Sequence, residues 1–373
     1  MSAPSLAHRL EYALFAGIST VVRVLPERGA LALGAGLGWL VGSVLRLRRS
    51  VVNENLARAF PEASPDWRRK VARASYRHLG REGVALLRMQ AMSPAEVRDR
   101  TEVVGLERVR RAIAEGRGVL ILTGHLGNWE IGGAATAACG IPLDVVARRQ
   151  KNPLFNARLI RVRERLGMRV IDRQGATRHV LRAMREPRAV ALVADQNVRT
   201  GGLFVDFFGV PASTERGPAL IAERTGADVV VAIVHRLPGR WARYRLSFEP
   251  MESQPLGARP LGSGPLESES PTSDPHGSES RSIEPADPTL LTRAYLAALE
   301  RGIRAAPDQY FWFHRRWKTR PDPQELKAEE PAPSATVPDA PKSDAMKPEP
   351  GPGNVGPDRG ARAGHAMDPG EPA

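Results

Sequence analysis

The sequence predicts an α/β fold with a central mixed, mostly parallel sheet that is flanked by helices. From Thr101 onward, short uninterrupted apolar runs typical of buried strands alternate with longer segments of helical spacing. Strands that alternate with helices favour a parallel sheet covered on both faces. Hydrophobic residues make up 42% of the 373-residue chain, and the single cysteine, Cys139, excludes a disulfide framework and a cysteine-based zinc site.

The expected elements follow one another along the chain in a simple order. A helical stretch covers about 53–90, where Asp66 is placed to cap a helix that starts near Trp67. Strands are expected at 118–123, 143–147, 169–171, 190–194, 228–235 and 243–248. Helices are expected at 106–115, 132–139, 155–166, 177–185, 217–225 and 289–305, and Pro307 ends the last of them.

The first fifty residues are strongly apolar. Segments 12–22 and 29–45 carry no charge, and the second is followed at once by Arg46, Arg48 and Arg49. Seventeen residues is the lower limit for crossing a bilayer, and flanking cations favour the cytoplasmic side. We expect residues 1–50 to form a membrane anchor, as a transmembrane helix or a helical hairpin. The alternative is a glycine-rich helix pair that docks on the following domain.

Charge is distributed unevenly along the chain, whose net charge is +13. Residues 252–287 hold 7 acidic and 2 basic residues, and residues 321–373 hold 10 acidic and 5 basic residues. Both stretches are rich in Pro, Ser, Gly or Ala, which predicts a disordered insert at 252–287 and a disordered tail at 322–373. The folded domain at 51–321, with its N-terminal anchor, is then left with +23. Such a surface favours anionic partners: nucleic acid, a membrane or a phosphorylated substrate.

The most informative motif is Thr-Gly-His-Leu-Gly-Asn-Trp-Glu at residues 123–130. His125 directly follows a buried strand, and Glu130 lies at the start of the next helix. Ligands of open α/β sheets collect beyond the carboxyl ends of the strands. A carboxylate hydrogen-bonded to the imidazole would fix its tautomer, so that the ring could take a proton from a hydroxyl nucleophile. The competing interpretation is an ordinary structural histidine.

This motif resembles the His-x4-Asp/Glu motif of the late acyltransferases of lipid A biosynthesis, and other segments agree in the family's order. Residues 147–154 are similar to the family's arginine-containing stretch after the second strand, and 195–196 with 202–211 are similar to its central block. Residues 300–304 and 307–318 look like its C-terminal signature. The resemblance covers roughly residues 8–321, and related members acylate other glycolipids, including mannosylated phosphatidylinositol.

The resemblance implies an enzyme of the inner membrane, with its catalytic domain facing the cytoplasm. It would move an acyl chain from acyl-carrier protein or acyl-CoA to a hydroxyl of a lipid A precursor or related glycolipid, without a metal or cofactor. By the family pattern, His125 is the general base and Glu130 is its partner. The residues expected to bind substrate are Asn128, Arg148, Arg163, Asp195 and Gln196. Arg149 stands where the family usually has proline, so either Arg148 or Arg149 could face the site.

Two other functional classes stay open on the sequence alone. A basic membrane-peripheral protein could bind nucleic acid, and aromatic residues interleaved with cations at 311–318 suit a single strand as well as a lipid headgroup. Against this, the chain carries no recognised nucleic-acid-binding module. A non-catalytic lipid-binding subunit is the third interpretation, and the presence of both His125 and Glu130 speaks against it. The 311–318 segment could also simply close the core.

Overall fold

The computed structural model describes residues 4–251 and 288–322. The predicted insert at 252–287 lies outside the described residues, as does the predicted tail apart from its first residue.

A seven-stranded sheet forms the centre of the described chain, with strand order β1-β9-β8-β2-β5-β3-β4. Its strands are β1 (Thr101–Val104), β2 (Val119–Thr123), β3 (Leu143–Ala147), β4 (Met168–Asp172), β5 (Ala189–Val193), β8 (Asp228–Arg236) and β9 (Tyr244–Pro250). Neighbouring strands are parallel except for β8 and β9, which are antiparallel. This confirms the mixed, mostly parallel sheet.

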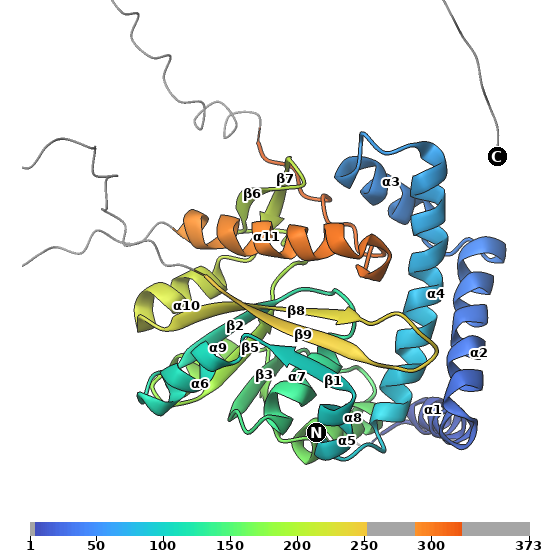
Figure 1. The fold of residues 1–373 in the computed structure, drawn as a ribbon, viewed down its shortest axis with the longest axis horizontal. Coiled ribbons are helices and arrows are strands. Elements are labelled where there is room, and N and C mark those ends of the chain that lie inside the picture. Colours follow the sequence, from blue (N-terminus) through green and yellow to red (C-terminus); the bar gives the residue numbers. More distant parts are fainter. Residues whose placement is uncertain (1–3, 252–287, 323–373) are drawn as a thin grey trace, which may run out of the picture. The chain divides into compact units, whose positions relative to one another are not determined.

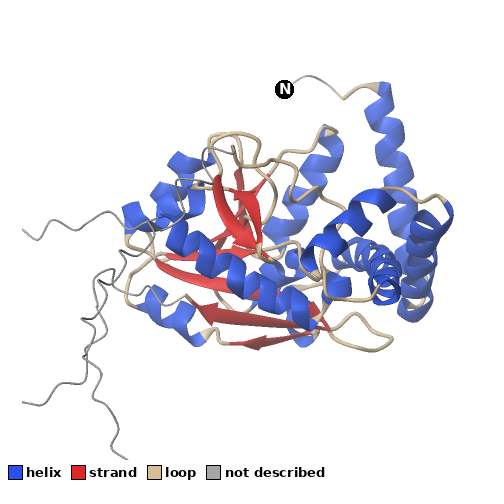
Figure 2. Ribbon diagram, turned by 90° about the horizontal axis from the view of Figure 1, so that it is seen from above, coloured by secondary structure: helices blue, strands red, loops and turns tan. Residues whose placement is uncertain are grey.

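Helices cover both faces of this sheet (Figures 1 and 2). The alternating side chains of β2 separate two hydrophobic cores: Leu120 and Leu122 enter one, and Val119 and Ile121 enter the other. The first core includes residues of α9 (Ala176–Ala183), α10 (Gly217–Thr225) and α11 (Pro288–Ala305). The second includes residues of α5 (Pro94–Asp99), α6 (Glu107–Ala114), α7 (Trp129–Ala138) and α8 (Pro153–Arg165). The strand β2 is apolar on both of its sides because both sides are buried.

Several elements differ from the sequence-based expectation. The helical stretch at 53–90 is two helices, α3 (Arg49–Ala59) and α4 (Pro65–Met89), and Ser64 rather than Asp66 caps the second. Pro65 occupies the first turn of α4, where its missing N–H costs nothing. The antiparallel hairpin β6 (Leu203–Phe207) and β7 (Val210–Thr214) was not predicted, nor were the short elements α5 and β1.

The apolar N-terminus forms α1 (Leu6–Val24), α2 (Glu27–Trp39) and a π-helical turn at Leu40–Val44. Figure 1 shows α2 alongside α4 at one end of the sheet. Gly34 and Gly38 face the backbone of α4, where a Cβ on either would overlap the carbonyl oxygens of Gly80 and Tyr76 respectively. Close approach of two helix backbones requires small residues at the contact. The glycine-rich segment therefore docks on the domain, as the alternative interpretation expected.

None of the described helices is by itself both long and apolar enough to cross a bilayer. One bent pair, Glu27–Val44 with Arg49–Ala59, meets that test by length and composition, with a 91° bend between its parts. The expected single transmembrane helix is therefore not seen. The N-terminal segment instead exposes large apolar side chains along α1: Leu6, Leu10, Leu14, Ile18, Val21 and Val24.

The glycine contact between α2 and α4 gives a stability prediction with a matched control. Gly38→Ala should destabilise the protein by about 1–3 kcal/mol, because the new methyl group cannot fit against the α4 backbone. Gly36→Ala, in the same helix with open space around it, should be neutral or stabilise by up to about 1 kcal/mol. Thermal unfolding of both variants measures the difference. Equal melting temperatures would show that α2 is not packed on α4.

Candidate active site

The candidate site lies at the carboxyl ends of two neighbouring parallel strands. The register of β2 and β5 pairs Thr123 with Val193. The residues two positions further along, His125 and Asp195, are therefore brought opposite each other just beyond the sheet. Their meeting follows from the order and register of the strands.

The His125 imidazole is held by Asp195. Nδ1 of His125 lies 2.6 Å from Oδ1 of Asp195, and the backbone N–H of His125 donates to Oδ2 at 2.8 Å. The amide nitrogen of Gln196 lies 3.2 Å from Nε2 of His125. A carboxylate at Nδ1 favours the tautomer with its proton there, which leaves Nε2 as the basic atom. Rotation of the Gln196 amide would offer an acceptor once Nε2 is protonated.

Glu130 is not the partner of the imidazole, which corrects the sequence-based expectation. Its carboxylate instead forms a bidentate ion pair with Arg163, with Arg163 Nε and a terminal nitrogen at 3.0 and 2.5 Å. Glu130 lies in the first turn of α7, and Arg163 lies in the last turn of α8. Glu130 is only five residues from His125 in sequence, whereas Asp195 follows the end of β5 and is 70 residues away.

The environment of this pair sets its protonation states. Burial alone would lower the pKa of His125, but the charge and hydrogen bond of Asp195, with a smaller contribution from Glu130, raise that pKa above 6.5. Burial opposes ionisation of Asp195, yet His125 and the nearby Arg316 hold the pKa of this carboxyl below its ordinary value. Asp195 is thus a buried anion, suited to stabilise a protonated imidazole.

The loop that carries His125 is supported by the segment at 309–311. The N–H of Gly127 donates to the carbonyl of Gln309 at 3.0 Å, and the N–H of Phe311 donates to the carbonyl of His125 at 2.9 Å. Gly127 has φ +60°, and a Cβ there would overlap the carbonyl oxygen of Val234, so only glycine fits. The ring of Trp129 contacts the imidazole edge-on at a centroid distance of 4.6 Å.

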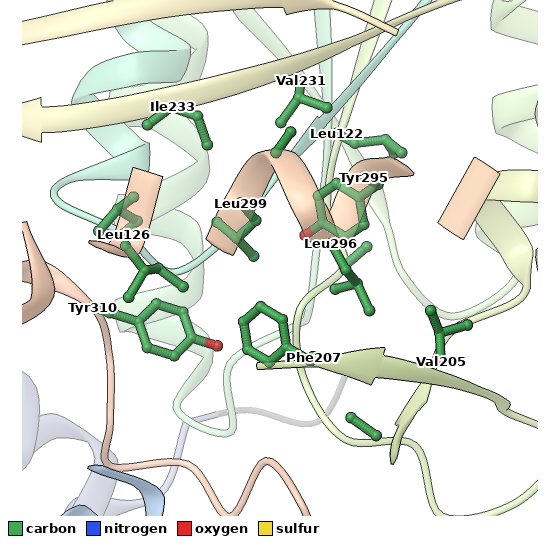
Figure 3. Close-up of a cluster of buried hydrophobic side chains, with 14 of the residues drawn as sticks. Leu122, Leu126, Val205, Phe207, Val231, Ile233, Tyr295, Leu296, Leu299 and Tyr310 are labelled. Atoms are coloured by element: carbon green, nitrogen blue, oxygen red, sulfur yellow. The ribbon is translucent and has the colours of Figure 1, made fainter. Parts of the chain in front are cut away.

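The segment 311–318 closes the core, one of the interpretations that the sequence left open. Trp312 and Trp317 are 0% and 2% exposed. Figure 3 shows Tyr310 and Tyr295 with Leu126 and Leu299 in one cluster of buried hydrophobic side chains. Burial, together with the charge of Asp195, raises the pKa of both tyrosines well above 10, so they stay neutral donors. The aromatic side chains therefore exclude water from the buried carboxylate.

A cavity of about 510 Å³ is lined by His125 together with residues of β2, β3 and β5 and of the helices beside them. Small or apolar residues make up part of its lining, among them Ile121, Gly132, Gly133, Val145, Ala191 and Ile221. The predicted residues Glu130, Arg148, Arg163 and Gln196 line it as well, while Arg149 is absent from the lining. Arg173, which the sequence analysis missed, also lines the cavity. Like Arg148, it directly follows a strand of the sheet, which is the signal that could have identified it.

Asn128 does not reach the cavity, in contrast to the predicted substrate contact. Its side-chain oxygen caps α7 by accepting from the N–H of Ile131 at 3.1 Å, and its amide nitrogen donates to Glu82 at 2.9 Å. Glu82 also accepts from Arg236 and from the hydroxyl of Tyr244, at 2.9 and 2.8 Å. Asn128 therefore shapes the His125 loop through a buried polar network.

This network gives a second stability prediction. Glu82→Ala should cost about 3–5 kcal/mol, because it leaves the guanidinium of Arg236 buried without its counter-ion. The control is Glu102→Ala, which removes an exposed ion pair with Arg245 and should cost no more than about 1 kcal/mol. Denaturant unfolding of both variants makes the comparison. A loss for Glu82→Ala as small as the control would contradict the network's structural role.

Within the described ranges, no group of three or more His, Cys, Asp or Glu side chains is arranged to hold a metal ion. The chemistry available at the site is proton transfer by His125, supported by Asp195, beside a cavity lined by both apolar side chains and arginines. Among the described lining residues of that cavity there is no serine or cysteine.

The chain is similar to known acyltransferases over most of its length. The family model of bacterial lipid A biosynthesis acyltransferases matches residues 2–319. A lipid A biosynthesis lauroyltransferase of Escherichia coli is 29% identical over 310 residues, which is 82% of this chain and 90% of the relative. A palmitoleoyltransferase of the same organism is 28% identical over 300 residues, 80% and 87% of the two chains. A phosphatidylinositol mannoside acyltransferase of Mycobacterium tuberculosis is 33% identical over 219 residues, 56% and 67% of the two chains.

The fold, the site and these relatives define an enzyme that transfers acyl groups. The chain belongs to the bacterial lipid A biosynthesis acyltransferase family.

Proposed function

We propose that the enzyme transfers a fatty acyl chain from acyl-carrier protein to a hydroxyl of a lipid A precursor, with His125 as the general base. The observation that carries this proposal is the His125–Asp195 pair, with His125 in the lining of the 510 Å³ cavity. Family membership supports the lipid A acceptor. The +23 left after the two acidic segments are removed favours an acidic donor protein.

The proton and the acyl group move in one balanced sequence. Nε2 of His125 takes the proton of the acceptor hydroxyl, and the oxygen attacks the thioester carbonyl of the donor. Asp195 stabilises the imidazolium that forms. When the tetrahedral intermediate collapses, the C–S bond breaks, the ester C–O bond remains, and the imidazolium returns the proton to the leaving thiolate. The lack of serine and cysteine in the described cavity wall supports direct attack over an acyl-enzyme.

The positions of the arginines in the cavity suggest a role for each. Arg163 is held by Glu130 through two of its nitrogens, so that its remaining terminal nitrogen is left to stabilise the oxyanion. Arg148 and Arg173 follow neighbouring strands and line the same cavity. We assign them to the phosphate of the donor's phosphopantetheine arm, which planar guanidinium groups bind well. The apolar wall then receives the acyl chain.

The membrane is the natural location for such an acceptor. The apolar residues of α1 recur every three or four positions from Leu6 to Val24 and are largely exposed. A helix with such a face can lie in the membrane interface without spanning it. We assign the enzyme to the cytoplasmic face of the inner membrane, attached through α1 and the start of α2.

A phosphatidylinositol mannoside is the second candidate acceptor, because relatives of that activity are 33% identical to this chain. The purified enzyme should be incubated with acyl-carrier-protein donors of graded chain length and with each acceptor. Mass spectrometry should find a lipid A precursor heavier by one acyl chain. Transfer to the mannoside alone would assign the second acceptor, and transfer to neither would overturn the proposal.

A further inference from the structure

We propose that a second, basic pocket beside the active site binds a phosphate group of the membrane-borne acceptor lipid. The pocket is lined by Arg48, Ser50, Val51, Asn197, Arg199, His314, Arg315 and Lys318, and is here named the Arg48 pocket. This inference rests on the proposed function, since it specifies how the acceptor is held.

The Arg48 pocket carries four cations and no counter-charge. Its volume is about 660 Å³, and no acidic side chain of the described chain lines it. Arg199, Arg315 and Lys318 form no ion pair with any described residue. Elsewhere on the surface, arginines such as Arg108 and Arg245 are paired with carboxylates. Four cations that line one pocket without a carboxylate partner repel one another, and a bound phosphate would relieve that repulsion.

Backbone contacts fix the walls of the Arg48 pocket. A terminal nitrogen of Arg48 donates to the carbonyl of Phe313 at 3.1 Å, which ties the start of α3 to the segment 311–318. The N–H of Asn197 donates to Nε2 of His314 at 2.9 Å. The cations are thus carried by three separate segments that the fold holds together.

The position of the pocket identifies the source of the phosphate. Asn197 lines both this pocket and the active-site cavity, and it directly follows Gln196, which contacts His125. The pocket also adjoins an exposed apolar segment. Arg48 directly follows this segment, whose large apolar side chains Val44, Leu45 and Leu47 are 55–65% exposed. A phosphorylated lipid with its chains along this apolar segment would place its phosphate among the cations and its sugar toward His125. A phosphate on the donor would instead approach through Arg148 and Arg173, on another part of the cavity wall.

The test is steady-state kinetics of the full-length enzyme and of the double variant Arg199→Gln/Arg315→Gln. Two acceptors are compared, the phosphorylated lipid A precursor and the same lipid after enzymatic removal of its phosphates. The double variant should raise the KM for the phosphorylated acceptor about tenfold or more, because two charge-assisted hydrogen bonds are lost. Its kcat and its KM for the acyl donor should stay within about twofold, and the dephosphorylated acceptor should show no added loss.

Arg111→Gln is the matched control, because Arg111 is an exposed cation on α6 that lines a different surface pocket. An unchanged KM in the double variant, or an equal rise for both acceptors or in the control, would overturn the proposal. A raised donor KM instead would assign the Arg48 pocket to the donor and would also overturn it.

A binding experiment distinguishes a failure of this inference from a failure of the proposed function, because it does not depend on acyl transfer. Sedimentation with phosphatidylcholine vesicles that contain phosphatidic acid should show weaker binding of the double variant than of wild type, even if no transfer occurs. Competition by inorganic phosphate alone, with no difference between vesicles with and without phosphatidic acid, would indicate a free-phosphate site and contradict a lipid source.

Discussion

His125→Ala should lower the rate of acyl transfer by about 10²–10⁴-fold, because the site loses the imidazole that takes the proton from the acceptor hydroxyl. The variant removes Nε2 from the cavity lining, while Asp195 and the arginines remain. The rate should be measured with purified enzyme, a lipid A precursor and acyl-carrier-protein donor, at saturating concentrations of both substrates. The loss should appear in kcat, since the base acts in the transition state.

His179→Ala is the control for this variant. His179 is exposed on α9 and does not line the cavity, so its replacement should leave the rate within about twofold. Both variants should give the same circular dichroism spectrum as wild type. A folded His125→Ala enzyme with normal kcat would remove His125 from the mechanism.

Asp195→Asn should also lower kcat by about 10²–10⁴-fold, although asparagine has the same size. The variant loses the negative charge that stabilises the imidazolium, and its amide can impose the wrong tautomer on Nδ1. Glu130→Gln is the informative comparison, since Glu130 pairs with Arg163 rather than with the imidazole. We expect it to lose clearly less activity than Asp195→Asn.

Comparing these two variants shows which carboxylate, Asp195 or Glu130, supports the imidazole of His125. A larger loss for Glu130→Gln than for Asp195→Asn would show that the sequence-based pairing of His125 with Glu130 was right in solution. Rescue offers a further check: Asp195→Glu keeps the charge and should recover more activity than Asp195→Asn.

Much of the fold could be predicted from the sequence because its local signals are strong. The buried strands of the sheet are continuous apolar runs, so β3 and the helix α10 were predicted at their observed bounds. The hairpin β6–β7 was not predicted. Its two-residue turn consists of Phe208 and Gly209, and the aromatic pair Phe207 and Phe208 gives no recognisable turn signal in the sequence. The division of α3 from α4 depends on a short turn that helical spacing does not reveal.

The site was predicted in part, and the limit has a physical cause. His125, Arg148, Arg163 and Gln196 all line the cavity, as the motifs suggested. The pairing of His125 with Asp195 depends on β2 lying next to β5, and strand order is set by tertiary packing. Likewise, the capping role of Asn128 depends on Glu82, from a helix 46 residues earlier.

The pH dependence of kcat/KM for wild type and Asp195→Asn tests the central claim most directly. A general base acts only when neutral, so the rate should rise with pH through the pKa of His125, which lies above 6.5 in the wild type. Without the Asp195 charge, burial dominates and lowers that pKa, so the acid limb of the variant should move to lower pH while its maximum rate falls. An acid limb in the same place for both enzymes, or no acid limb in the wild type, would contradict the His125–Asp195 base.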